Sequence, residues 1–542
     1  MIKSKHMRAR FLTTVLVVGS LLPSQLMAKH FFPCTADQLE AAIIQANLNC
    51  EDDVIDLQCN SFELTASDNS TPTNGSNGLP VIGPDSGHKL KIKNGVISRS
   101  TAMITQEFRF FEVNPDAFLI LEEVTLENGV VATGTGLAVS GGAILNQGTV
   151  ELKDSTIVGF VEPATLQPNA LLGGAIYNDI GATLHIKGST FAGNQAADGG
   201  AVFNASTISE ICSTRFVNNV AIPPTVPLAM LPPTGQGGAI FNQANSTIAL
   251  IRRSIFDQNQ AMGVGLGYGG AISNDGSASP AAAIETISYT TFINNSATAS
   301  GGAIMNEGSI SVIFASTLAY NRAPGNGGGI YNLASIGAIS NSTFSSNVSG
   351  ENGGGINNFT GAIIGALTNN TIVFNFVGND GGGIYDDGLI LSIISNLVAQ
   401  NKATGGTSPD IFLDHDGNLG TPKFNLIGDG AHALNGSVCN VFLSAYQNLV
   451  GNCVLSEVID PLLESLANNG GPTLTHALRP LSPAIDTGFN PAPLELKFDQ
   501  RGPGHPRTMN GLTDIGSFEL CADFDGDGDC DDNGHCDDNV GS

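Results

Sequence analysis

The stretch that decides the fold is Gly301-Gly-Ala-Ile-Met-Asn306, which returns 26 residues later as Gly327-Gly-Gly-Ile-Tyr-Asn332. The pattern is Gly-Gly, then Ala or Gly, then Ile or Val, then any residue and Asn. Its copies begin at Gly141, Gly173, Gly199, Gly237, Gly269, Gly301, Gly327, Gly353 and Gly381, and the last of these ends in Asp386 where the others carry Asn. The shortest steps between starts are 26 residues, so the chain carries an internal repeat with insertions.

A second motif alternates with the first. It is an apolar residue followed three positions later by Asn, and usually preceded by Ser-Thr. Its copies are Phe191/Asn194, Phe216/Asn219, Phe256/Asn259, Phe292/Asn295, Leu318/Asn321, Phe344/Asn347, Ile372/Asn375 and Val398/Asn401. Between the two motifs lie short segments in which apolar and polar residues alternate, such as Thr247-Ile-Ala-Leu250. Alternation predicts strands with one buried face.

One repeat therefore predicts one coil of three short strands, and the whole chain predicts an all-β, right-handed, single-stranded parallel β-helix. The Gly-Gly pair permits a corner with positive φ. The Ile or Val and the Phe are expected to stack in the core on their copies in neighbouring coils. The recurrent Asn is expected to take a left-handed corner conformation or to form a hydrogen-bonded ladder along the stack.

These repeats resemble the passenger domains of chlamydial polymorphic outer membrane proteins, and more broadly bacterial secreted β-helix proteins. The resemblance covers Gly141 to Asn401 and implies a surface-exposed β-helix. Chlamydial relatives end in a membrane barrel with a terminal aromatic residue, whereas this sequence ends in Asn539-Val-Gly-Ser542. That departure puts self-transport through an outer membrane in question.

The first 60 residues predict export and a cap. A basic start, the apolar run 11–22 and small residues up to Ala28 predict a signal peptide over 1–28. Residues 29–60 predict an N-terminal cap, with a helix from Ala36 to Asn47 whose apolar side comprises Leu39, Ile43, Ile44 and Ala46. Thr35 and Gln38 form a capping box, and a first strand follows. No transmembrane segment is expected in the mature chain, and the formal charge of −27 disfavours nucleic acid and anionic membranes.

The coils are expected over 61–410 and a C-terminal closing module over 411–520. From Asp460 to Glu519 the sequence resembles the choice-of-anchor module of bacterial β-helix surface proteins. The polar residues there favour buried structural pairs, Asp499 or Asp486 with Arg501, over catalysis.

The remaining residues, 521–542, form an acidic tail that contains cysteines. Asp523, Asp525, Asp527, Asp529 and Asp531 occupy alternate positions around glycines, which predicts a calcium loop. The segment is similar to the calcium repeats of dockerins and thrombospondin type 3 modules, and the alternative is a solvated acidic tail. Eight of the nine cysteines lie near the chain ends, which predicts disulfides there, with Cys212 as a buried free thiol.

Two classes of function remain open. The first is a non-enzymatic, adhesin-like or cell-envelope protein at the cell surface, with a host receptor, a glycan or an envelope component as its partner, and with no cofactor other than calcium. The second is a polysaccharide hydrolase or lyase, for which Asp380, Asp386 and Asp387 are the best carboxylates. No Gly-His-Gly or Arg-Ile-Lys accompanies them, and the coils from Gly327 to Asp387 contain no Lys, Arg or His. The sequence therefore favours the first class and assigns no catalytic residue.

Overall fold

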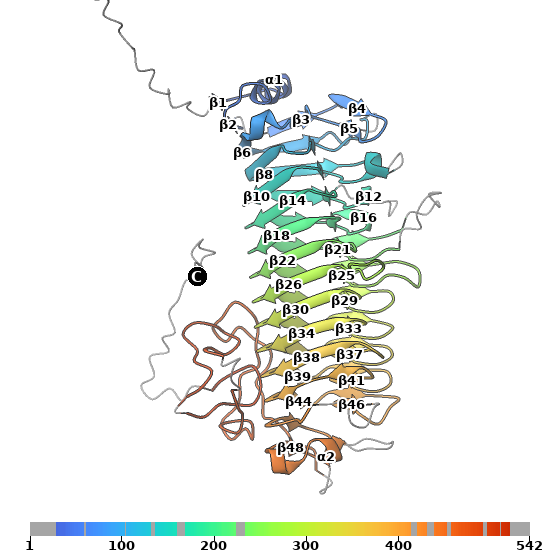
Figure 1. Cartoon of the computed structure of the whole chain (residues 1–542), viewed down its shortest axis with the longest axis vertical. Coiled ribbons are helices and arrows are strands. Elements are labelled where there is room, and N and C mark those ends of the chain that lie inside the picture. Colours follow the sequence, from blue (N-terminus) through green and yellow to red (C-terminus); the bar gives the residue numbers. More distant parts are fainter. Residues whose placement is uncertain are drawn as a thin grey trace, which may run out of the picture.

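The structure is a computed structural model, and it describes residues 29–58, 61–102, 105–131, 136–159, 169–223, 234–413, 420–430, 438–452, 457–490, 496–509 and 511–520. Within these ranges the chain winds into stacked coils whose strands form three parallel sheets along one long axis (Figure 1). The predicted parallel β-helix is confirmed. The strands are short because each coil must turn three corners.

The first sheet receives two strands from most coils, and three from the coil of β42, β43 and β44. Its members are β1 (Lys29–Phe31), β2 (Asp53–Asp56), β3 (Ser61–Leu64), β6 (Lys89–Arg99), β8 (Phe118–Gly129), β10 (Thr149–Lys153), β11 (Thr156–Gly159), β14 (Thr183–Lys187), β15 (Thr190–Ala192), β18 (Thr207–Cys212), β19 (Arg215–Val217), β22 (Thr247–Arg252), β23 (Ile255–Asp257), β26 (Ala283–Ser288), β27 (Thr291–Ile293), β30 (Ser309–Phe314), β31 (Thr317–Ala319), β34 (Ser335–Ser340), β35 (Thr343–Ser345), β38 (Ile363–Thr368), β39 (Thr371–Val373), β42 (Leu389–Ile390), β43 (Ile393–Ile394), β44 (Leu397–Ala399), β47 (Leu426–Ile427) and β48 (Leu449–Val450).

The second sheet follows the Phe/Asn motif, and its strands are β12 (Ala170–Leu172), β16 (Gln195–Asp198), β20 (Val220–Ala221), β24 (Gln260–Ala261), β28 (Ser296–Ala297), β32 (Arg322–Ala323), β36 (Val348–Ser349), β40 (Phe376–Val377) and β45 (Lys402–Ala403). The third sheet carries the Gly-Gly motif, and its strands are β7 (Phe111–Val113), β9 (Ile144–Asn146), β13 (Ile176–Asn178), β17 (Val202–Asn204), β21 (Ile240–Asn242), β25 (Ile272–Asn274), β29 (Ile304–Asn306), β33 (Ile330–Asn332), β37 (Ile356–Asn358), β41 (Ile384–Asp386) and β46 (Ile411–Leu413). A small hairpin, β4 (Asn69–Thr71) with β5 (Gly75–Asn77), lies outside these sheets.

The Gly-Gly motifs align in one column, as predicted. Ile144 pairs in register with Ile176, Ile176 with Val202, and Val202 with Ile240. The first glycine of the motif takes positive φ, +70° at Gly301. The second is required by close approach, because a Cβ on Gly302 would lie 2.2 Å from the carbonyl oxygen of Gly328 in the next coil.

The Phe column forms the predicted aromatic stack. Phe216 and Phe256 have ring centroids 4.7 Å apart, as do Phe256 and Phe292, and each pair of rings lies within 8° of parallel. The column continues through Leu318, Phe344, Ile372 and Val398, all fully buried. Such stacked rings add to the stability that burial of their apolar area provides.

The recurrent asparagines form two buried ladders. In the third sheet Asn146 donates from Nδ2 to Oδ1 of Asn178 at 2.7 Å, and the same bond repeats coil by coil as far as Asp386. At the Phe/Asn corner a second ladder runs from Asn194 to Asp410. The left-handed alternative is wrong, because positive φ occurs instead at other corner residues such as Asn218 and Asn294.

The N-terminal end is capped by α1 (Ala36–Ala46). The Gln38 amide donates to the Thr35 hydroxyl at 3.2 Å, so Thr35 is confirmed as the N-cap. The Gln38 side chain accepts from the Cys34 amide at 2.8 Å instead of from the Thr35 amide, so the second half of the predicted capping box is displaced by one residue. Leu39, Ile43 and Ala46 are buried as predicted, but the fourth buried position is Ala42, whereas Ile44 is exposed.

At the other end, α2 (Val438–Val441) closes the stack, and Val438 and Phe442 belong to the same buried core as the coils. Residues 457–520 are largely irregular, and they do not cover this end. They lie along the flank of the coils, beside β34, β38 and β44 (Figure 1). The predicted closing module therefore divides into an end cap and a flanking segment.

Candidate functional site

The three carboxylates of the polysaccharide-enzyme alternative are held by neighbouring coils. Asp386 is 7% exposed, and its Oδ1 accepts hydrogen bonds from Asn358 Nδ2 at 2.7 Å and from the Gly388 amide. Asp380 Oδ1 accepts from the amides of Thr407 and Ser408. Asp387 accepts from the Thr360 hydroxyl. These contacts hold the coils together, and they give the hydrolase alternative no support.

Asp386 and Asp410 end the ladders of the two motifs, whereas a third ladder, of Asn370, Asn396, Asn425 and Asn448, ends in an asparagine. In each ladder the side-chain NH2 group of one Asn donates toward the next C-terminal coil, so the positive end of that amide dipole points toward the C-terminal coils. The last member has only to accept hydrogen bonds from the preceding Asn, which a carboxyl group can do. Asp410 Oδ1 accepts from both the amide and Nδ2 of Asn401, at 3.0 and 2.9 Å, and Asp410 Oδ2 accepts from the Asp429 amide.

Asp410 makes the fold sensitive to pH. Burial raises the pKa of this carboxyl to about 7, although the hydrogen bonds from Asn401 lower it. The folded state therefore holds a proton that the unfolded chain releases near pH 4. This contribution to stability is fully present below the unfolded pKa and is lost as the pH rises through about 7. Burial likewise raises the pKa of Asp198 to about 6, which acts in the same direction.

We therefore expect the melting temperature to fall between pH 5 and pH 8. Thermal unfolding followed by circular dichroism measures it, and Asp410→Asn should make the profile clearly flatter, since one pKa unit corresponds to about 1.4 kcal/mol. An unchanged slope in this variant would show that Asp410 does not titrate in that range.

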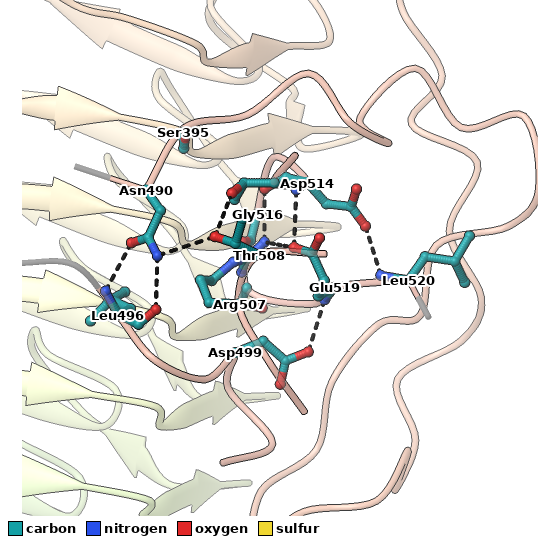
Figure 2. A network of polar contacts seen from close by, with 12 residues as sticks. Ser395, Asn490, Leu496, Asp499, Arg507, Thr508, Asp514, Gly516, Glu519 and Leu520 are labelled. Carbon is teal, nitrogen blue, oxygen red and sulfur yellow. Dashed lines mark hydrogen bonds and ion pairs between the residues drawn. The ribbon is translucent and has the colours of Figure 1, made fainter. Parts of the chain in front are cut away.

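The flanking segment 457–520 contains a buried ionic network. Arg507 donates to the carbonyl oxygens of Asp514 and Gly516 and to Glu519 Oε2 at 2.8 Å, and both charged side chains of that ion pair are buried (Figure 2). Burial raises the pKa of Glu519 to about 8, while Arg507 opposes the shift. Arg501 pairs with Asp499 at 2.6 Å, so this predicted structural pair is confirmed. The Asp486 amide donates to Asp514 instead.

The same segment is bonded to the outer wall of the coils through residues that sequence reasoning missed. Gln500 contacts the hydroxyls of Thr317, Thr343 and Thr473, and His476 contacts the Ser345 hydroxyl at 2.9 Å. Burial lowers the pKa of His476. One signal in the sequence could have pointed to these contacts. Thr317, Thr343 and Thr371 form a column on the outer face of β31, β35 and β39, and their hydroxyl groups are buried and need hydrogen-bond partners.

Insertions at one corner produce exposed loops. The loop 262–268 follows β24. It packs closely against Gly235 of the preceding coil, where an added Cβ would lie 2.4 Å from the Gly263 amide nitrogen. On this loop Val264 is 96% exposed and Leu266 is 47% exposed. Exposed apolar side chains on a loop held by a rigid scaffold are typical of contact surfaces.

The predicted calcium ligands Asp523, Asp525, Asp527, Asp529 and Asp531 lie outside the described residues. Among the residues that the structure does describe, no group of three or more His, Cys, Asp or Glu side chains is placed to hold a metal ion. Two expectations about cysteines are wrong. Cys212 is disulfide-bonded, not free, and Cys50 is a free, exposed thiol. Cys34 is disulfide-bonded.

In the described ranges no helix has both the length and the apolar character needed to cross a bilayer. Neither the curated proteins nor the solved structures contain a match to this chain. Residues 289–307, which span a Phe/Asn motif and the following Gly-Gly motif, match the Chlamydia polymorphic membrane protein repeat. The chain is thus similar to those proteins in this repeat, and its stacked coils fit a β-helix of the same kind.

Proposed function

We propose that the protein is an exported, non-enzymatic β-helix that is associated with the outer membrane or cell surface and acts there by binding a partner. The observation that carries the proposal is the Chlamydia polymorphic membrane protein repeat at 289–307, set in a continuous stack of coils of the same pattern. The carboxylates best suited to an enzyme on this fold bond the coils to one another, which further supports binding over catalysis.

The contact surface of this proposal is the corner that carries the insertion loops. The rigid coils hold the described loop 262–268 in place, and its Val264 and Leu266 offer apolar area to a partner. A host receptor, a glycan or a component of the cell envelope would each meet this corner from outside, without entering the packed core.

The test combines location with binding. Protease treatment of intact cells should remove the protein if it is surface-exposed. The purified chain should bind host cells, immobilised glycans or envelope fractions, while it releases no reducing sugar from pectin, alginate or glucuronans. Turnover that disappears in the Asp386→Asn, Asp387→Asn double variant would overturn the proposal in favour of the enzyme.

A loop variant locates the contact surface. Val264→Asp combined with Leu266→Asp should reduce binding at least tenfold, because it places two charges in the apolar patch, while stability changes by only about 0.5 kcal/mol. The matched control is Ile180→Asp, since Ile180 is 81% exposed on a turn at a different corner. Equal binding by both variants would place the contact elsewhere.

For the tail we propose weak calcium binding by Asp523, Asp525, Asp527, Asp529 and Asp531. Their alternation supplies hard oxygen ligands, and the expected dissociation constant is roughly 10⁻⁴ to 10⁻³ M, as for extracellular modules. Calorimetry on the full chain should show this binding, and a chain that stops at Leu520 should lose it. Identical isotherms would remove the metal from the proposal.

A further inference from the structure

The flanking segment follows one outer face of the first sheet and stops partway along it. The Gly516 amide donates to the Ser395 carbonyl at 2.9 Å, and Ser517 bonds the hydroxyls of Thr371 and Thr343. The Thr473 hydroxyl donates to the carbonyl oxygen of Ala315, which directly follows β30 at the same corner. The farthest contact is at Tyr289, whose ring lies beside Gly502.

The same face continues into the next three N-terminal coils as a basic patch. Arg253 takes the corner position of Tyr289 one coil earlier, and Arg252 pairs in register with Ser288. Arg215 and Lys187 follow on neighbouring strands. We name these four cations the Cys212 patch. Its acidic neighbours are Glu210, which pairs with Lys187 at 2.9 Å, and Asp257.

Cys212 lies at the centre of this patch. It pairs in register with Lys187 on one side and with Arg252 on the other, so its side chain points to the outer face. It is nevertheless only 2% exposed, and it is disulfide-bonded. A disulfide requires Cα atoms within about 7 Å of each other. The partner must therefore come to this face of this coil.

Distance along the stack excludes most cysteines. Cys34 and Cys59 flank the first coil, five strand steps from β18, or about 24 Å at ~4.8 Å a step. Cys439 and Cys453 adjoin α2 and β48 at the opposite end. Cys50 is free. The partner is therefore one of the cysteines after Leu520.

Chain reach admits all three. Ser517 bonds Thr343, which lies four coils from Arg215, or about 19 Å at ~4.8 Å a step. The four steps from Ser517 to Cys521 span at most ~14 Å, and a disulfide bridges up to a further ~7 Å between Cα atoms, so Cys521 can reach Cys212. Cys530 and Cys536 have ample chain to do so.

Charge favours the same docking. The chain carries a net charge of −27, yet four cations gather around Cys212, while residues 523–532 hold six aspartates and no cation. Docked beside Arg252 and Arg253, those carboxylates would meet guanidinium groups, which bind carboxylates well.

We propose that residues 521–542 dock on the Cys212 patch and are held there by a disulfide from Cys212 to Cys521, Cys530 or Cys536. The two thiols lose two electrons and two protons to a disulfide-containing thiol oxidant, which is reduced to two thiols as the protein S–S bond forms. The tail thereby fastens the flanking segment to the middle of the β-helix, independently of calcium.

The covalent part is tested by digesting the unreduced full chain and identifying cross-linked peptides by mass spectrometry. We expect a peptide that joins Cys212 to Cys521, Cys530 or Cys536 and disappears on reduction. Cys212 recovered as a free thiol, or joined to any other cysteine, would overturn the proposal.

The electrostatic part is tested in Cys212→Ser, in which only charge holds the tail. With a chelator present, proteinase K should remove the tail about tenfold faster in 0.5 M than in 0.05 M salt, since salt screens exposed charges. In the Cys212→Ser background, the further changes Arg252→Gln and Arg253→Gln should make cleavage at 0.05 M salt as fast as at 0.5 M salt. The control change Arg479→Gln removes an exposed arginine that pairs with Glu464, and it should leave cleavage at 0.05 M salt slow.

Melting temperatures confirm that the coils of each variant remain folded. If the Arg252→Gln, Arg253→Gln variant and the Arg479→Gln variant lose the tail at the same rate, charge does not dock the tail. Protection of the tail that appears only when calcium is added would also overturn this part of the proposal. These outcomes concern the tail alone, so they leave the proposed surface function to its own test.

Discussion

Replacing Phe256 with alanine should lower the free energy of unfolding by about 3–5 kcal/mol. The ring is fully buried and stacked on both sides, with Phe216 and Phe292 each 4.7 Å away between centroids. The coils above and below are fixed by their own hydrogen bonds, so they cannot collapse into the space left behind. The loss should therefore include both the transfer energy of the ring and the cost of a cavity.

Chemical denaturation followed by circular dichroism measures this loss, with Phe359→Ala as the matched control. Phe359 is also aromatic, but it is partly exposed and meets Tyr331 edge-on, so its truncation should cost much less. If both variants unfold at the same denaturant concentration, the Phe column does not contribute to the stability of the core.

The repeat made the fold predictable because each part of it has one physical role. Gly301 needs positive φ, and Gly302 needs the absence of a Cβ. Ile304 and Phe292 each occupy a core position that an apolar residue fills again in the neighbouring coils. Each requirement recurs with the coil, so the sequence pattern alone reveals it. The N-terminal cap was predictable too, because the N-cap hydrogen bond between Thr35 and Gln38 is local in sequence.

What escaped prediction depends on contacts between distant parts of the chain. No local pattern places Gln500 against Thr317 and Thr343, more than 150 residues earlier, or His476 against Ser345. The disulfide of Cys212 escaped for the same reason, since its outward direction is known only once β18 is in register with its neighbours. For Asp386, the sequence offered a catalytic carboxylate, whereas its ladder contact with Asn358 indicates a structural role.

The ladders predict that a carboxyl group is accommodated at their ends and not within them, so Asn321→Asp should destabilise the fold severely at neutral pH. Asn321 is fully buried. Its Oδ1 accepts from the amide and Nδ2 of Asn295, both at 3.0 Å, and a carboxylate could still do this. Its Nδ2 donates to the Phe292 carbonyl at 3.0 Å and to Asn347 Oδ1 at 2.9 Å, and a carboxylate cannot.

The variant would therefore place a buried negative charge against two acceptors, at about 1–3 kcal/mol for each unsatisfied group and more for the charge. We expect a loss of at least about 4 kcal/mol at pH 7 in denaturant unfolding. Below about pH 5 the loss should become smaller, because a protonated carboxyl regains one donor. Asn218→Asp is the control, since Asn218 is an exposed residue at a neighbouring corner and should change stability by about 0.5 kcal/mol or less. A penalty for Asn321→Asp that matches this control, or that does not shrink in acid, would show that the ladder has no fixed direction of donation.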